Sequence, residues 1–174
     1  MLRKAIIIVA ALILASLSGC SVDGPVSVTD QDENLSLELV LPKSRYREDE
    51  EITCKAVLTY VGDDQTFEFF TGDPLLKFAI GGGEYFNGDL DLVQRDVICP
   101  QKIEKGVPVE YPFKKYMGRH LDSDESAVKF WKEFLAQEQL ILPPGKYEII
   151  ARVSYTSARD TSSVLTVRHK IQVQ

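Results

Sequence analysis

Two segments near the C-terminus alternate apolar and polar residues, and this pattern constrains the fold more than any other feature of the sequence. Tyr147 to Tyr155 places an apolar side chain at every second position, and Leu165 to Val173 does the same. Successive side chains of a β-strand point to opposite faces, so a period of two indicates strands with one buried face. A helix would need its apolar residues three and four positions apart. The chain is therefore predicted to build its core from sheets.

Further segments of this kind precede the two C-terminal ones. The longer ones are Leu35 to Leu41 and Ile52 to Tyr60, and the shorter ones are Thr66 to Phe70, Leu75 to Ile80 and Val107 to Phe113. Gly and Pro residues separate them, and Gly72-Asp73-Pro74 is predicted to break the chain between two strands. Many short strands divided in this way favour an all-β sandwich of antiparallel sheets.

One segment has helical rather than strand spacing. Asp122 and Glu125 stand three apart, as in a capping box at a helix N-terminus. Apolar residues then recur three and four apart, at Ala127, Phe130, Trp131, Phe134 and Leu135. We expect one amphipathic helix over about residues 123–138, inserted between strands and packed on the sandwich through this aromatic stripe. The alternative is that the stripe contacts a partner helix or lipid.

The N-terminus has the composition of an export signal. Arg3 and Lys4 precede an apolar run from Ala5 to Leu17 that is interrupted only by Ser16, and small residues follow it up to Cys20. The run has 13 residues, which span about 20 Å as a helix, and the hydrocarbon core of a bilayer is roughly 30 Å thick. We therefore predict a cleaved signal peptide over residues 1–19 and no permanent transmembrane helix there.

The tetrad Leu17-Ser18-Gly19-Cys20 resembles the lipobox of bacterial lipoproteins. This resemblance implies cleavage before Cys20 and attachment of a diacylglyceryl group to its sulfur. Two or more acyl chains, such as palmitate, hold a protein stably on a bilayer. The protein is then expected on the outer face of the cell membrane, or at the outer membrane of a Gram-negative organism. An ordinary secretory signal followed by a chance cysteine is the alternative.

The residues after Cys20 are polar and acidic. Asp23, Asp30, Asp32 and Glu33 lie in this stretch, so residues 20–34 are predicted to be a lipidated N-terminus and a flexible tether, and residues 35–174 the folded domain. A flexible linker of this length has a reach of about 20 Å. Removal of the signal leaves 18 basic and 26 acidic residues, a net charge of −8. Such a charge argues against nucleic acid as a partner.

Two cysteines remain besides Cys20, and their state has two interpretations. Export places Cys54 and Cys99 in a compartment where a disulfide between them can persist. Two separate buried thiols are the alternative, because free cysteine is among the most buried residue types.

The residues give little support to catalysis or metal binding. Of the two histidines, His169 falls on the apolar face of the last strand, where a hydrogen-bonded core position is expected, and His120 is expected in a loop. The segment Asn87 to Asp91 begins like a calcium loop, but Leu92 and Ile98 occupy the positions that need Gly and a bidentate Glu. We predict no catalytic residue, no metal and no cofactor.

Two short segments carry resemblances to known folds and families. Pro143-Pro144-Gly145-Lys146-Tyr147 is similar to the entry into the penultimate strand of immunoglobulin-like domains, where a tyrosine corner sits two residues before a core cysteine. Here Ile149 takes the place of that cysteine. The predicted fold is accordingly an immunoglobulin-like β-sandwich with one helix.

Thr53 to Ile80, together with Leu142 to Tyr147, resembles uncharacterised exported lipoproteins of Gram-positive bacteria and, more distantly, the BsuPI-type proteinase-inhibitor domain. The leading expectation is a non-enzymatic binding or interaction module tethered to the bilayer, with an unknown protein or envelope partner. One alternative is a proteinase inhibitor that inserts Phe70 to Leu76 or Gly81 to Asn87 into a protease cleft. The other is a structural role in envelope or spore-coat assembly.

Overall fold

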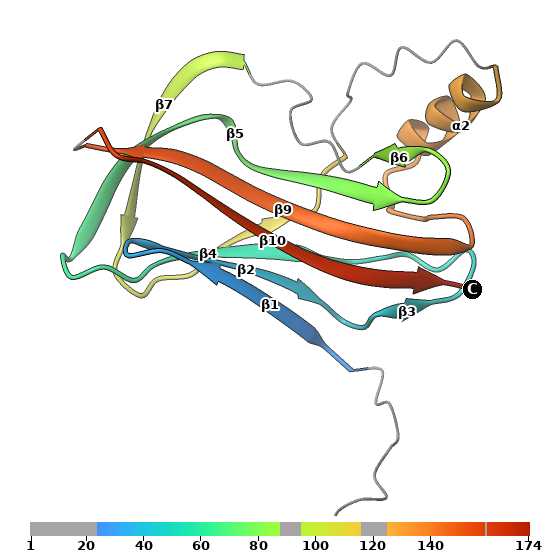
Figure 1. The fold of residues 1–174 in the computed structure, drawn as a ribbon, viewed down its shortest axis with the longest axis horizontal. Helices are drawn as coiled ribbons and strands as arrows, with labels where there is room; N and C mark the ends of the chain where they lie inside the picture. The colour runs from blue at the N-terminus through green and yellow to red at the C-terminus, as the bar shows by residue number, and fades with distance from the viewer. Residues whose placement is uncertain (1–23, 88–94, 116–124, 159) are drawn as a thin grey trace, which may run out of the picture.

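Two β-sheets pack face to face, with one helix at an end of the molecule (Figure 1). The computed structural model describes residues 24–87, 95–115, 125–158 and 160–174. The four-stranded sheet has the order β1 (Val26–Gln31), β2 (Leu35–Leu41), β4 (Lys55–Tyr60) and β8 (Val109–Pro112). The six-stranded sheet has the order β3 (Arg45–Tyr46), β10 (Ser162–Val173), β9 (Gly145–Ser157), β5 (Thr66–Gly82) and β6 (Phe86–Asn87), and β7 (Arg95–Glu104) also pairs with β5. The predicted all-β sandwich with one helix is confirmed.

The alternating residues supply the core between the sheets. Leu35, Leu37, Leu39 and Leu41 of β2 are all fully buried, and every second residue of β9 and β10 faces them. Burial of one such leucine contributes about 2 kcal/mol relative to an exposed one. A shift of β2 by one residue would therefore expose all four leucines, and this fixes its register.

The tyrosine corner implied by the resemblance is present at the start of β9. The Tyr147 hydroxyl donates a hydrogen bond of 2.9 Å to the Pro143 carbonyl, four residues earlier. Ile149, which replaces the core cysteine, is fully buried. At the edge of the six-stranded sheet next to β10, β3 pairs in parallel with the end of β10, so the chain passes from the first sheet to the second directly after β2.

The predicted break at Gly72-Asp73-Pro74 is wrong, because β5 runs through it as one strand of 17 residues. Its pairing with β9 shifts between Thr71 and Leu76, where β5 bulges away from its neighbour. The Thr71 hydroxyl donates a hydrogen bond of 2.9 Å to the Ser154 carbonyl at this point. Gly72, Asp73 and Pro74 lie in this bulge, and β5 pairs with β9 again from Leu76 onward.

The predicted flexible tether is wrong for residues 26–31, which form β1. This strand pairs antiparallel with β2, from Val26 opposite Leu41 to Gln31 opposite Ser36. Asp30 also accepts a hydrogen bond of 2.8 Å from the Thr166 amide of β10, so β1 lies along the edges of both sheets. The contacts with β10 join segments that are far apart in sequence. They provide hydrogen-bond partners for backbone groups that would otherwise be unpaired at the sheet edges. Only residues 21–25 separate Cys20 from β1.

The helix α2 (Glu125–Ala136) ends two residues earlier than predicted, and the predicted start, including Asp122, lies outside the described residues. Its aromatic stripe packs inward: the Phe86 ring of β6 meets Trp131 at 5.1 Å and Phe134 at 5.3 Å, edge to face. At its C-terminus the Lys115 ammonium donates to the Phe134 and Gln137 carbonyls at 2.7 and 2.9 Å, which complements the helix dipole. No helix within the described ranges has the length and apolarity needed to cross a membrane.

Candidate functional site

A groove of about 650 Å³ lies on the outer face of the six-stranded sheet, which is the face turned away from the core. It exists because β5 ends in Gly81 and Gly82, which carry no side chains to fill the surface beside β9. Ile150 of β9 lines it and is only 1% exposed, although it points away from the core and packs with Ala79 in a cluster of its own. The groove thus has an apolar floor.

Basic side chains surround this floor. Arg45 of β3, Lys146 of β9, and Arg168 and Lys170 of β10 line the groove, and Glu148 is the acid among the lining residues. The register explains the grouping, because Arg168 lies opposite Ile150 and Lys170 opposite Glu148 on neighbouring strands. Arg168 and Glu148 form an ion pair of 3.3 Å, but both side chains reach solvent, and such pairs contribute little to stability. The lining therefore carries a net positive charge on a protein that is negative as a whole.

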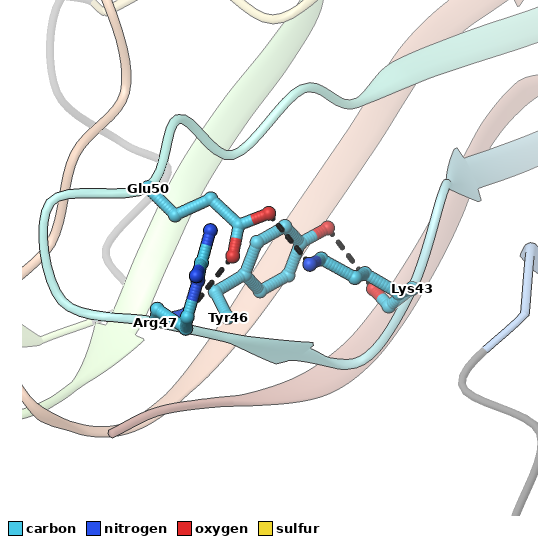
Figure 2. A network of polar contacts seen from close by, with 4 residues as sticks. All are labelled: Lys43, Tyr46, Arg47 and Glu50. Atoms are coloured by element: carbon cyan, nitrogen blue, oxygen red, sulfur yellow. Dashed lines mark hydrogen bonds and ion pairs between the residues drawn. The ribbon is translucent and has the colours of Figure 1, made fainter.

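A polar network fixes the loop that brings Arg45 to the groove (Figure 2). The Glu50 carboxylate binds the Lys43 ammonium at 2.5 Å and accepts a hydrogen bond of 3.0 Å from the Arg47 amide. The Tyr46 hydroxyl donates to the Lys43 carbonyl at 3.0 Å. The amide of Arg47 and the ammonium of Lys43 hold the pKa of Glu50 below its usual range. These contacts fix the backbone on both sides of Arg45.

Ser44, on the same loop, forms a hydrogen bond with His169 of β10. The Ser44 hydroxyl lies 2.8 Å from Nε2 of the ring, and burial lowers the pKa of His169. The predicted hydrogen bond is confirmed, although the ring is only half-buried. A serine nucleophile would also need a group that orients the other ring nitrogen. Within the described ranges no carboxylate is hydrogen-bonded to it. His120 lies outside the described residues.

Cys54 and Cys99 are free thiols in this structure and occupy different environments. Cys54 is buried just before β4, and burial raises its pKa to about 12. Cys99 lies on β7 and is partly exposed. The lipidation candidate, Cys20, lies outside the described residues.

The two segments considered as inhibitory loops have other environments. Phe70 to Leu76 is not a loop, because it belongs to β5. Gly81 to Asn87 contains the end of β5, a turn and β6, and its Tyr85 and Phe86 rings pack against Phe130 of the helix. The calcium-like segment from Asn87 to Asp91 lies largely outside the described residues. In the part of the chain that is described, no three His, Cys, Asp or Glu side chains are placed to hold a metal.

The charged residues that line the groove can be seen in the sequence, but they occupy what look like ordinary surface positions of strands. Lys146 and Glu148, and likewise Arg168 and Lys170, occupy the polar positions of their strands. Polar positions of a half-exposed strand are ordinarily solvated, so nothing local marks them as a site. Their combination depends on the pairing of β9 with β10 and on the glycines of β5, which are distant in sequence.

No model of a known protein family matches the sequence, and no curated protein is significantly similar to it.

Proposed function

We propose that the protein is a lipid-anchored, extracytoplasmic binding module that takes an anionic group into the groove of its six-stranded sheet without chemical conversion. The observation that carries the proposal is the convergence of Arg45, Lys146, Arg168 and Lys170 around one hollow. The lipobox-like tetrad that ends in Cys20 supports the anchor and the location outside the cytoplasm.

The chemistry of the lining favours phosphate, sulfate or carboxylate. An arginine guanidinium binds such groups through two parallel hydrogen bonds, and a lysine ammonium adds a mobile point charge. Because the chain is negative overall, an anion is repelled by most of the surface and attracted by this part.

The Ser44–His169 pair is the reason for proposing binding without chemical conversion. It is the nucleophile-like arrangement in the groove region, and among the described residues no third group orients and polarises the ring. Burial favours a neutral imidazole, which accounts for the pair as a structural hydrogen bond between the β3 loop and β10.

A polyanion tests the groove directly. The probe is dextran sulfate, with uncharged dextran as its comparison, and the protein is the unlipidated Cys20→Ala chain. The groove double variant, Lys146→Gln with Lys170→Gln, is expected to lose at least about tenfold in affinity, since each cation near a polyanion contributes on the order of 1 kcal/mol.

The matched control removes the same charge elsewhere. Lys55 pairs with Glu110 on the four-stranded sheet, and Lys105 bonds the Asp63 carbonyl at a turn, so Lys55→Gln with Lys105→Gln forms the control double variant. Its affinity should stay close to that of the parent. Equal losses in both variants, or equal binding of charged and uncharged dextran, would contradict a dedicated anion site. Loss of membrane retention in Cys20→Ala cells tests the anchor.

A further inference from the structure

We infer that the groove face lies against the bilayer that holds the lipid anchor and takes anionic lipid headgroups as its ligand. This inference rests on the proposed function, because it places the anchor at Cys20. It goes further by naming the source of the anion and the orientation of the domain.

The position of β1 brings the anchor close to the groove. Val26, the first residue of β1, pairs with Leu41, and three residues later the chain reaches Ser44 on the groove wall. Three residues span at most about 10 Å. Figure 1 shows the same relationship, since β1 begins at the end of the sandwich where β3 lies and β10 finishes. The chain therefore enters the domain beside the groove.

The linker that remains is short. Because β1 occupies residues 26–31, only residues 21–25 connect Cys20 to the sandwich. Six fully extended residue steps from Cys20 to Val26 give a ceiling of about 20 Å. A domain on such a linker must keep one of its surfaces in contact with the headgroups.

The distribution of charge decides which surface that is. The β3–β4 connection at the end of the sandwich carries Arg47 and four acids, Glu48 to Glu51. Only Glu50 of these acids pairs with Lys43, so the connection stays net negative and would be repelled by anionic lipid. The outer face of the six-stranded sheet next to it carries the cationic lining of the groove. Cations near an anionic leaflet are attracted, and the attraction fades within about a Debye length, roughly 8 Å. The domain should thus lie on this face and not stand on its end.

The lipid anchor and the groove then act together. Acyl chains hold the protein at the bilayer, and the short linker raises the effective concentration of headgroups at the groove. Weak electrostatic contacts suffice under these conditions, because association with the surface has already been achieved by the anchor.

The first experiment uses the lipidated protein in vesicles of phosphatidylcholine, with or without a large fraction of phosphatidylglycerol. Acetylation of individual lysines by a water-soluble reagent is followed by mass spectrometry. Lys146 and Lys170 should react several times more slowly in the anionic vesicles, and salt should restore their rates. Lys55 and Lys105 should react equally in both vesicles. Equal rates for Lys146 and Lys170 in the two vesicles would overturn the inference.

A second arm does not depend on the anchor. The Cys20→Ala chain is sedimented with the same vesicles, and its partition into the anionic ones should fall about 25-fold in the groove double variant, at about fivefold per cation. The control double variant should change less than about twofold by the same reasoning. If Cys20 carries no lipid but this arm succeeds, the anchor is wrong and the headgroup contact stands.

A third arm separates the two sources of anion. Soluble glycerol phosphate or dextran sulfate is added to the lipidated protein in neutral vesicles. If these soluble anions protect Lys146 and Lys170 and anionic vesicles do not, the ligand of the groove is a soluble anion and not a lipid headgroup. That result would overturn the inference and leave the proposed anion-binding function intact.

Discussion

The Tyr155 hydroxyl of β9 donates a hydrogen bond of 2.7 Å to the Asp32 carboxylate in the turn between β1 and β2. The same carboxylate accepts hydrogen bonds from the Ser163 hydroxyl and from the amides of Asn34 and Leu35. One side chain in the segment expected to be a tether thus joins the N-terminal hairpin to both long strands of the other sheet.

Replacement of Asp32 by Ala should lower the free energy of unfolding by about 2 kcal/mol or more, because several donors lose a charged acceptor at once. Urea denaturation of the Cys20→Ala chain measures this loss. The neighbouring Glu33 is exposed, with a weak contact of 3.5 Å to Asn34, so Glu33→Ala serves as the control and should change stability little. Similar losses in both variants would mean that the Asp32 contacts do not stabilise the fold.

The same carboxylate makes stability sensitive to acid. Burial raises the pKa of Asp32, but hydrogen bonds from Leu35, Ser163, Tyr155 and Asn34 outweigh it and hold the pKa below its ordinary value of 3.8. The folded state therefore binds fewer protons than the unfolded state in this range. Its contribution is complete above pH 3.8 and is lost as pH falls through the lower, folded-state pKa.

Urea denaturation at several acidic pH values tests this linkage. The difference in unfolding free energy between the parent and Asp32→Asn should shrink as pH falls through that window. A constant difference at all pH values would show that the charge of Asp32 does not contribute.

Phe86 should be the residue on which docking of the helix depends. Its ring contacts Phe130, Trp131, Phe134 and Tyr147. Phe86→Ala should cost about 3 kcal/mol through the cavity it leaves. Trp131 is the single tryptophan of the chain, so its fluorescence should shift to the red as water reaches it.

A substitution on the opposite side of the helix provides the control. Val128 is 52% exposed, and Val128→Ala should leave both fluorescence and stability nearly unchanged. Unaltered tryptophan emission in Phe86→Ala would indicate that the helix does not rest on β6.

The two thiols of the domain should react at different rates. Cys99 is partly exposed, and burial keeps Cys54 protonated with a pKa of about 12. A thiol reagent added to the folded Cys20→Ala chain should modify one thiol quickly and the second only after unfolding. Cys99→Ser should remove the fast phase. A slow reaction of both thiols that a reducing agent accelerates would indicate a disulfide instead.

The alternation of residues was sufficient to predict the strands that build the core. Leu35 to Leu41 and Leu165 to Val173 became β2 and most of β10, because a period of two leaves only one way to bury one face. The aromatic spacing around Trp131 likewise predicted a packed helix. These elements bury most of their apolar side chains, so local sequence and tertiary structure agree.

The peripheral strands could not be predicted in this way. β1 contains Asp30 and few apolar residues, and it is ordered by partners in β2 and β10 that are distant in sequence. In β7, the neighbouring apolar residues Val97 and Ile98 are both exposed, so its sequence does not show the alternation of apolar and polar residues that marks a strand with one buried face. Such strands are specified by the backbone pairing that they complete, and backbone groups are the same in every sequence.

The sequence by itself determined the sandwich, its helix and the lipobox-like N-terminus, since each depends on residues that are neighbours along the chain. Only the tertiary structure decided where the basic groove lies and how short the linker to Cys20 is. The groove combines outward side chains of β9 and β10 with glycines of β5, and the linker is shortened by an edge strand. Both depend on pairing between distant strands, because surface positions carry no burial signal that would reveal their neighbours.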